Sequence, residues 1–251
     1  MKIAGCEAIV TGAGSGIGAD VARVLAARGM HVALWDVNEE AVRKIADEID
    51  GKAALCDVTS AESVQHALAK TVSAPRLLVN CAGILIGKKI VGKDGAADLS
   101  HFEKTLAVNV TGTFNVMRLV AEKMATLDTV TADGERGVIV NTASIAAFEG
   151  QIGQVAYSAS KGAIVAMTLP AARDLARSGI RVMAIAPGAV ETPMMAGVRD
   201  DIREAIEQNV PFPPRMGQPS EFADLVAHIA ENSYLNGSVI RLDGGARLAG
   251  K

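Results

Sequence analysis

The sequence predicts an α/β fold in which one domain holds a doubly wound parallel sheet flanked by helices. Short apolar runs rich in β-branched residues alternate along the chain with longer stretches of helical periodicity. This alternation is typical of right-handed strand–helix–strand units. Apolar residues form 49% of the 251 residues, but Phe, Trp and Tyr together only 3%. The core is therefore built from small and branched aliphatic side chains, as in a sheet that is buried on both faces.

Seven runs have the length and composition of buried strands, and most are followed at once by a polar or glycine-containing segment. They cover residues 8–10, 31–35, 53–56, 77–79, 138–141, 182–185 and 239–242. Strands that are joined through helices run parallel, and open parallel sheets bind ligands beyond the carboxyl ends of their strands. We therefore expect the functional side chains just after these seven runs.

Helical patterns fill most of the remaining sequence. They cover residues 16–28, 39–49, 61–72, 99–125, 154–178, 201–208 and 220–231. Two long stretches are largely irregular, 84–98 and 189–219, and loops of this length in a compact domain are usually functional. We expect both to border a substrate. No linker or repeat divides the chain, so we expect a single domain over residues 1–251.

The charge and cysteine content narrows the function classes. The net charge is −3 and the isoelectric point about 5.8, which favours neither nucleic acid nor an anionic membrane as a partner. Cys6, Cys56 and Cys81 are odd in number and lack metal-ligand spacing, and the four histidines are scattered, so we expect no metal site. We predict a cytoplasmic protein for three reasons. The cysteines do not form an even set, the first residues leave no room for a signal peptide, and no apolar run is long enough to span a membrane.

A glycine-rich turn follows the first predicted strand. Its order is G-x-x-x-G-x-G, and a helix begins directly after it. Glycines allow a tight turn and the close approach of a phosphate, while the helix start offers free N–H groups. The turn predicts a dinucleotide site, although a purely structural turn is the alternative. The residues predicted to contact the cofactor here are Gly12, Ser15, Gly16, Ile17 and Gly18.

Asp36 directly follows the second predicted strand. A carboxylate at this place accepts hydrogen bonds from the adenine-ribose hydroxyls and repels a 2′-phosphate. Val37 and Ser15 supply no compensating positive charge, so we predict NAD rather than NADP. The alternative is that Asp36 caps the next helix, a task that Asn38 is equally suited to perform.

Two further segments that follow predicted strands are expected to contact the cofactor. Asp57 and Val58 come after the third strand and would border the adenine. The fourth strand is followed by small residues that let a flat cofactor lie close. These are Asn80, Cys81, Ala82 and Gly83.

Tyr157 and Lys161 are four residues apart in a predicted helix, so their side chains lie on one face of it. A nearby ammonium favours phenolate and is expected to lower the tyrosine pKa from its ordinary value of ~10. Ser144 follows the fifth predicted strand and can present a hydroxyl to the same place. The three residue types indicate proton transfer to a carbonyl or from a hydroxyl. Taken alone, the pair could also be an ordinary surface pair on a helix.

In combination, these motifs resemble the short-chain dehydrogenase/reductase family, which has a Rossmann-type fold. The family pattern appears in order as Thr11–Gly18, Asn80–Gly83, Asn109, Ser144, Tyr157 with Lys161, and Pro187–Gly188. The resemblance implies that Asn109, Ser144, Tyr157 and Lys161 are catalytic and that the protein is a homotetramer. Tyr157 would exchange the proton, Ser144 would hold the substrate oxygen, and Asn109 would fix a water that links Lys161 to solvent. The resemblance also implies cofactor contacts at Tyr157, Lys161, Pro187, Val190 and Thr192.

Within that family, residues 137–188 and 210–244 look like the type II 3-hydroxyacyl-CoA dehydrogenase branch, also called 17β-hydroxysteroid dehydrogenase type 10. The telling segments are 141–151, 210–213 and 235–244, and the sequence departs from the branch at 188–193 and 84–98. The resemblance implies NAD-dependent interconversion of an (S)-3-hydroxyacyl-CoA and a 3-oxoacyl-CoA. The alternatives are a 3-oxoacyl carrier-protein reductase, a hydroxysteroid dehydrogenase and a non-catalytic nucleotide sensor. Asp36 argues against the first, which normally prefers NADPH.

The substrate contacts are the least specific part of the pattern. Ser144 and Tyr157 are expected to touch the substrate, and Gln151 and Gln154 are further candidates, with helix-end solvation as the alternative. Met194 and Met195 fit an apolar substrate wall or ordinary loop packing. Three lysines of the first irregular stretch either meet the phosphates of coenzyme A or form a solvated charged loop. They are Lys88, Lys89 and Lys93.

Overall fold

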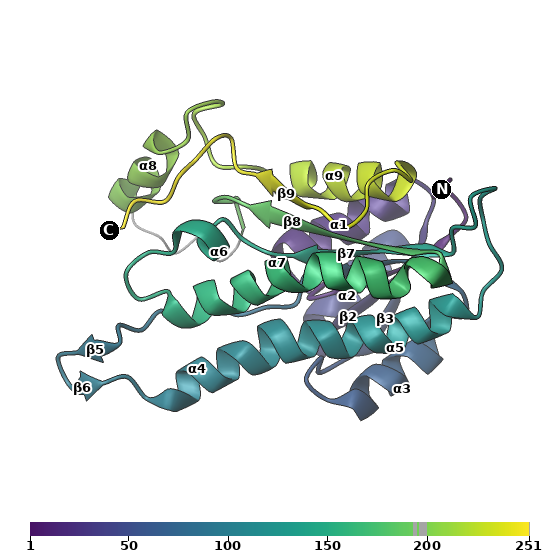
Figure 1. Ribbon diagram of the computed structural model, residues 1–251, viewed down its shortest axis with the longest axis horizontal. Helices are drawn as coiled ribbons and strands as arrows, with labels where there is room; N and C mark the ends of the chain where they lie inside the picture. Colours follow the sequence, from purple (N-terminus) through teal and green to yellow (C-terminus); the bar gives the residue numbers. More distant parts are fainter. Residues whose placement is uncertain (193–194, 196–199, 251) are drawn as a thin grey trace.

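The computed structural model describes residues 1–192, 195 and 200–250. Its main sheet has seven parallel strands in the order β3-β2-β1-β4-β7-β8-β9 (Figure 1). The strands are β1 Glu7–Thr11, β2 His31–Asp36, β3 Lys52–Leu55, β4 Pro75–Asn80, β7 Gly137–Thr142, β8 Ile180–Pro187 and β9 Val239–Leu242. All seven predicted strands are therefore present, and the predicted fold class is confirmed.

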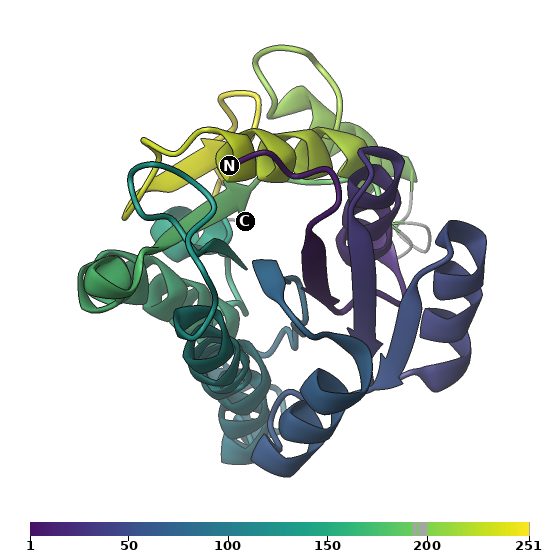
Figure 2. The same cartoon turned by 90° about the vertical axis from the view of Figure 1, so that its right-hand side faces the viewer.

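Helices cover both faces of this sheet (Figure 2). One face carries α1 Gly16–Ala27, α2 Glu39–Ile49 and α9 Pro219–Glu231, and the other carries α3 Ala61–Thr71, α5 Thr113–Ala125 and α7 Val155–Leu175. Three further helices lie toward the carboxyl edge of the sheet. They are α4 Leu99–Leu106, α6 Ala146–Glu149 and α8 Asp200–Gln208.

The two helical layers enclose two separate parts of the core. Alternate residues of a strand point to opposite faces, so Leu77 and Val79 pack against α1, α2 and α9, while Leu78 packs against α3 and α5. Every residue of β8 is buried. Burial on both faces explains why the strands appear in the sequence as continuous apolar runs.

The strand order reverses between β1 and β4, which follow one another in space but not in sequence. Thr11 at the end of β1 pairs with Asn80 at the end of β4, and Asn80 pairs in turn with Asn141 of β7. The Thr11 hydroxyl then accepts a hydrogen bond from the Ala82 amide at 3.2 Å. The carboxyl ends of three strands are thus level at the point where open parallel sheets bind ligands.

The predicted helix over 99–125 is interrupted. Residues Ala107–Gly112 form a π-helical segment between α4 and α5. Such segments insert one residue into a helical turn and occur frequently at functional sites. The apolar periodicity of the sequence does not reveal the insertion, because the pattern continues on both sides of it.

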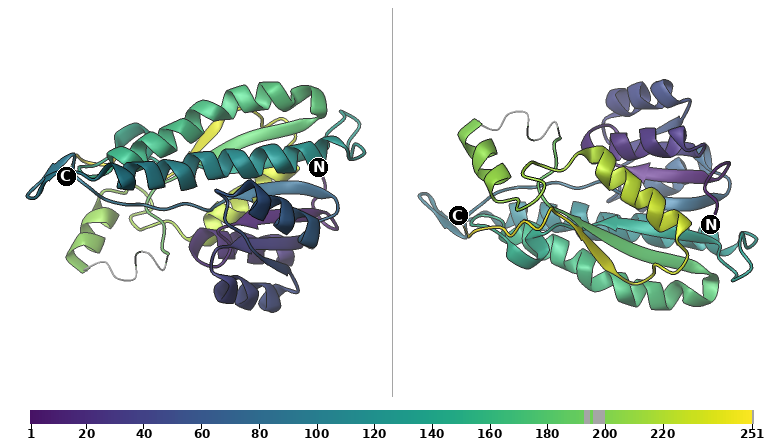
Figure 3. Two further views of the ribbon diagram at one scale, coloured as in Figure 1. Left: turned by 90° about the horizontal axis from the view of Figure 1, so that it is seen from below. Right: turned by 90° about the horizontal axis from the view of Figure 1, so that it is seen from above.

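Two other differences concern the first irregular stretch, 84–98, and the segment between β7 and α7. The first contains a short antiparallel hairpin, β5 Val91–Gly92 and β6 Gly95–Ala96, which projects beyond the carboxyl edge of the sheet (Figure 3). Gly95 has a φ of 105°, a backbone conformation that favours glycine and permits the tight connection. The four-residue helix α6 was also not predicted, because it is too short to show a period.

Replacing Leu78 by Ala should destabilise the protein by roughly 2–5 kcal/mol, because Leu78 is fully buried in β4 and the smaller side chain leaves a cavity. Urea unfolding at one protein concentration measures the change. Leu55 in β3 is 53% exposed, so Leu55→Ala is the matched control and should change stability by no more than about 0.5 kcal/mol. Equal losses in the two variants would contradict the core described above.

Candidate active site

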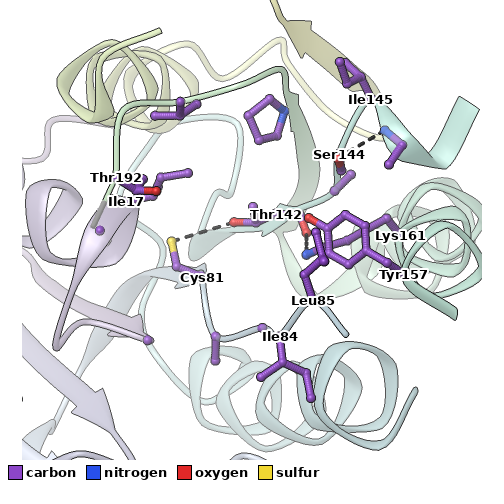
Figure 4. Close-up of a pocket in the computed structure, with 18 of the residues that line it drawn as sticks. Ile17, Cys81, Ile84, Leu85, Thr142, Ser144, Ile145, Tyr157, Lys161 and Thr192 are labelled. Carbon is purple, nitrogen blue, oxygen red and sulfur yellow. Dashed lines mark hydrogen bonds between the residues drawn. The ribbon is translucent and has the colours of Figure 1, made fainter. Parts of the chain in front are cut away.

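A cavity of about 1000 Å³ lies at the carboxyl edge of the sheet (Figure 4). Strand ends, the glycine turn and the long loops contribute side chains to it. The cavity brings together most of the predicted site residues, namely Gly12, Ser15, Gly16, Ile17, Gly18, Asp36, Asp57, Val58, Cys81, Ala82, Gly83, Ser144, Gln151, Gln154, Tyr157, Lys161, Pro187, Val190 and Thr192.

The glycine turn requires its glycines for packing. A Cβ on Gly12 would lie 2.8 Å from the backbone of Ala82, and one on Gly18 would lie 2.2 Å from the Gly12 carbonyl oxygen. Gly12 also has a φ of 65°. Ser15 stands at the N-cap of α1, but its side chain makes no capping hydrogen bond. The first N–H groups of α1 are thus not engaged by that side chain and can bind an anion.

Asp36 is held at the end of β2 by two backbone donors. Its Oδ2 accepts from the Gly14 amide at 2.9 Å and its Oδ1 accepts from the Asn38 amide at 2.9 Å. Asn38 caps α2 through a hydrogen bond from the Ala41 amide at 3.1 Å. Asp36 is therefore not the helix cap, and its carboxylate stands fixed at the cavity wall next to the glycine turn.

Ser144, Tyr157 and Lys161 meet at the middle of the cavity (Figure 4). The Ser144 hydroxyl lies close enough to the Tyr157 phenol to act on its pKa, and it accepts a hydrogen bond from the Ala146 amide at 3.1 Å. Lys161 Nζ lies 5.7 Å from the centre of the Tyr157 ring. It donates to the Thr142 carbonyl at 2.7 Å, so the end of β7 fixes its position. The pair is thus part of a cavity and not an ordinary surface pair.

The pKa values differ from the expectation based on spacing. Burial raises the pKa of Tyr157, and the hydrogen bond from Ser144 opposes this only in part. The predicted lowering by Lys161 is thus wrong for the protein by itself. Burial lowers the pKa of Lys161 from 10.5 to about 8, with the Cys81 thiol acting in the opposite direction. Removal from water disfavours the charged form of both groups, which moves an acid and a base in opposite directions.

Two predicted site residues lie behind the cavity wall. Asn80 is buried, and its side-chain amide donates to Asn141 at 2.9 Å, which joins β4 to β7. Asn109 lies in the π-helical segment, where its side-chain amide donates to the Ile84 carbonyl and the Ser160 hydroxyl, and its oxygen accepts from the Ile84 amide. Asn109 thereby fixes the chain after Gly83, close to Lys161.

Comparison with known proteins identifies the family. The model of the short chain dehydrogenase family matches residues 7–203. The chain belongs to the short-chain dehydrogenase family. It is an oxidoreductase that acts on a CH–OH group.

Two relatives within this family have the same name. The bovine protein named 3-hydroxyacyl-CoA dehydrogenase type-2 is 47% identical over 98% of this chain and 97% of its own length. The crystal structure of 3-hydroxyacyl-CoA dehydrogenase type-2 from Mycobacterium avium has a TM-score of 0.94 and 42% identity, with 98% of each chain covered. These comparisons confirm the resemblance to the type II branch.

A more distant structure in the comparison is a 7α-hydroxysteroid dehydrogenase in complex with NADH and 7-oxo glycochenodeoxycholic acid. It has a TM-score of 0.90 and 29% identity, with 100% of this chain and 97% of that chain covered. The fold of the short-chain dehydrogenases thus extends over the whole of this chain.

The two irregular stretches contribute lining residues, as expected, among them Leu85, Ile206, Asn209 and Val210. The cavity also contains residues that the sequence patterns did not indicate, including Lys104, Thr142 and the segment Ala246–Ala249. A cavity-facing position on α8 could be suspected from the apolar face of that helix. Nothing in the sequence places residues 246–249 here, because they reach the cavity only through the tertiary fold.

The structure also separates the predicted substrate contacts. Gln151 and Gln154 line the cavity and hydrogen-bond each other, with the Gln151 amide donating to Gln154 Oε1 at 3.1 Å. Met195 lines the cavity too, whereas Met194 lies outside the described residues. Lys88, Lys89 and Lys93 are not among the lining residues, which favours a solvated loop.

The part of the chain that the structure describes contains no helix fit to cross a membrane and no cluster of metal-binding side chains.

We expect the stability of the protein to depend on pH through Lys161. The unfolded chain keeps the lysine protonated up to 10.5, whereas the folded protein releases this proton near 8. The unfolded state therefore binds more protons between these values, and stability rises with pH by at most about 1.4 kcal/mol per unit. Lys161→Met lacks the titrating amine, so its stability should not change with pH for this reason. Urea unfolding at about pH 7.5 and about pH 9.5 should show that the wild type gains stability relative to the variant. Parallel changes in both proteins would contradict the lowered pKa.

Proposed function

We propose that this protein is an NAD-dependent dehydrogenase that interconverts (S)-3-hydroxyacyl-CoA and 3-oxoacyl-CoA. The observation that carries the chemistry is the placement of the Tyr157 phenol beside the Ser144 hydroxyl in a cavity whose other end holds the glycine turn. The substrate class rests on the relatives named 3-hydroxyacyl-CoA dehydrogenase type-2, to which nearly the whole chain is similar.

The residues present fit NAD. The glycine turn has no room for larger side chains, the start of α1 offers N–H groups to a pyrophosphate, and Asp36 presents a fixed carboxylate to the adenine ribose. Val37, the neighbour of Asp36, is 67% exposed and uncharged, so nothing at this position compensates a 2′-phosphate. NAD supplies the hydride acceptor for alcohol oxidation.

Tyr157 takes the proton from the substrate hydroxyl during oxidation and returns it during reduction. Ser144 donates a hydrogen bond to the substrate oxygen and stabilises the negative charge that develops there. Lys161 lies on the same face of α7 as Tyr157 and would contact the ribose of the nicotinamide. Its pKa of about 8 lies close to neutrality, which suits a group that passes protons onward. Asn109 holds the adjacent backbone and, as the family resemblance implies, a water that links Lys161 to solvent.

The proposal is tested with a panel of substrates. Acetoacetyl-CoA, a carrier-protein thioester, short ketones and a steroid ketone are each offered with NADH and with NADPH, and (S)- and (R)-3-hydroxybutanoyl-CoA are offered with NAD. We expect the highest kcat/KM among the ketones for acetoacetyl-CoA with NADH. Of the two alcohols, we expect the (S)-enantiomer to be preferred. Preference for the carrier-protein thioester or the steroid would assign one of the alternative functions, and activity only with NADPH would overturn the role of Asp36.

Tyr157→Phe should reduce kcat by at least about 100-fold, because it removes the group that exchanges the proton. NADH should still bind with its wild-type Kd, as the ring is retained. Turnover by the purified variant is compared with NADH fluorescence titration. Retained turnover would contradict the catalytic role.

We also propose that the protein is a cytoplasmic homotetramer. The three cysteines are free thiols in the structure, which suits a reducing compartment.

The tetramer is supported by exposed apolar side chains on helices of one face. Apolar residues occur all around α7, and a helix of this kind is normally buried on every side. Yet three large apolar side chains on neighbouring helices are exposed. The exposed fractions are 44% for Leu169 of α7, 50% for Phe114 of α5 and 66% for Leu99 of α4. These helices lie side by side on one face (Figure 1), which we propose as a contact between subunits.

Phe114→Asp should therefore lower the molar mass in light scattering from that of a tetramer to that of a dimer, because it places a charge in an apolar contact. Leu55→Asp introduces the same charge at an exposed leucine on β3 and should leave the tetramer intact. A tetramer in both variants, or a monomeric wild type, would contradict the proposed contact.

A further inference from the structure

The segment Ala246–Gly250, which follows β9, runs beyond the carboxyl edge of the sheet (Figure 3). The turn is made by Gly244 and Gly245, whose φ values are 58° and 82°. Asp243 closes it, since its side chain accepts from the Gly245 amide at 3.0 Å and its carbonyl accepts from the Ala246 amide at 2.9 Å. The direction of the segment is thus set by the turn.

Three hydrogen bonds tie this segment to the last residue of α6 and to the chain that leads from it to α7. The Leu248 amide donates to Glu149 Oε2 at 3.2 Å, the Gln151 side chain donates to the Ala249 carbonyl at 3.2 Å, and the Ile152 amide donates to the Gly250 carbonyl at 3.3 Å. The segment is therefore attached to the part of the chain that begins just after Ser144.

A balanced charge cluster holds the base of the segment. Arg241 Nη1 pairs with Glu149 at 2.8 Å and Arg241 Nε pairs with Asp243 at 2.7 Å. Arg247 pairs with the same two carboxylates at 3.4 and 3.3 Å. Both guanidinium groups thus pair with carboxylates, and the Arg247 side chain remains 60% exposed. Its remaining side chains, Ala246, Leu248 and Ala249, are apolar.

The same three apolar residues line the active-site cavity, on a wall that also contains Gln151. Leu248 is half-buried and is the largest of the three. The segment is also fixed on its other side, because the Phe212 amide donates to the Gly244 carbonyl at 3.3 Å. Arg247 lies in the same wall, but its guanidinium pairs with Glu149 and Asp243. The rest of the wall is apolar, and such a surface in the cavity that holds Ser144 suits a hydrocarbon chain better than a nucleotide.

We propose that residues 246–249 form the wall against which the acyl chain of the substrate lies, and that Leu248 sets the preferred chain length. Glu149 is a positioning residue that holds this wall through Arg241, Arg247 and the Leu248 amide. The proposal rests on the proposed acyl-CoA function, which it deepens by naming the residue that discriminates between substrates.

The test measures kcat/KM for a series from acetoacetyl-CoA to 3-oxododecanoyl-CoA. Leu248→Ala should raise the ratio of kcat/KM for the longest substrate to that for the shortest by about 10-fold or more, since a single methylene group in an apolar pocket is worth roughly 10–200-fold in discrimination. Leu248→Phe should lower the same ratio. The Kd of NADH should stay at the wild-type value in both variants, and Leu55→Ala is the control for loss of a leucine elsewhere. An unchanged ratio in the two Leu248 variants would overturn the proposal.

Glu149→Gln tests the positioning role, because it removes the charge and keeps the shape. It should raise KM several-fold for the substrates of the series, flatten the chain-length preference and leave the Kd of NADH unchanged. Asp224→Asn is the matched control, since it removes a surface ion pair with Arg28 at 2.7 Å that lies away from the cavity. A variant that only loses thermal stability and keeps the wild-type chain-length profile would contradict this role.

A parallel series of 2-alkanols with NAD separates this proposal from the acyl-CoA function. If the wild-type protein oxidises 2-alkanols but no 3-hydroxyacyl-CoA, the proposed function fails. The role of residues 246–249 is then tested by how kcat/KM depends on the chain length of the alkanols. A shift of their length profile in Leu248→Ala still supports the wall, and an unchanged profile overturns it.

Discussion

The seven strands of the main sheet run in one direction, and helices cover both of its faces. Because the sheet is covered on both faces, the interiors of its strands must be apolar. Polar side chains can reach a ligand only where the strands end. Thr11, Asp36, Asn80, Asn141 and Thr142 all stand at carboxyl ends. Because Thr11, Asn80 and Asn141 lie level in the sheet, the loops that follow them meet in one cavity. The glycine turn, the aspartate and the catalytic candidates share a site for this reason.

Within that cavity, burial has a larger effect on the acid and base groups than their mutual attraction. Tyr157 and Lys161 lie on one face of α7, yet Lys161 Nζ turns to the Thr142 carbonyl and remains 5.7 Å from the centre of the phenol ring. Each group loses solvent, so the phenol is harder to ionise and the ammonium easier to deprotonate. The lysine therefore acts from a place that β7 determines. The strand end is as much a part of the proton-transfer site as the helix that carries both residues.

Much of this arrangement could be predicted because it rests on local patterns. The strand runs reflect burial on two faces, the G-x-x-x-G-x-G order reflects steric limits around Gly12 and Gly18, and the position of Asp36 follows from the end of β2. Other features could not be predicted because no local pattern encodes them. The π-helical insertion at Asn109 leaves the apolar periodicity intact, and the hydrogen bonds of its side chain run to Ile84 and Ser160, far away in sequence.

The sequence by itself determined the fold class, the family and the set of residues at the cofactor end of the cavity, because each depends on short-range spacing or on periodic burial. At the substrate end, the sequence indicated the stretches 84–98 and 189–219, and the tertiary structure alone added residues 246–249. Residues 246–249 become a cavity wall only because the Gly244–Gly245 turn brings them to Glu149 and Gln151. It also decided the direction of the pKa shift of Tyr157, because desolvation depends on everything packed around the phenol and not on the residue four positions away.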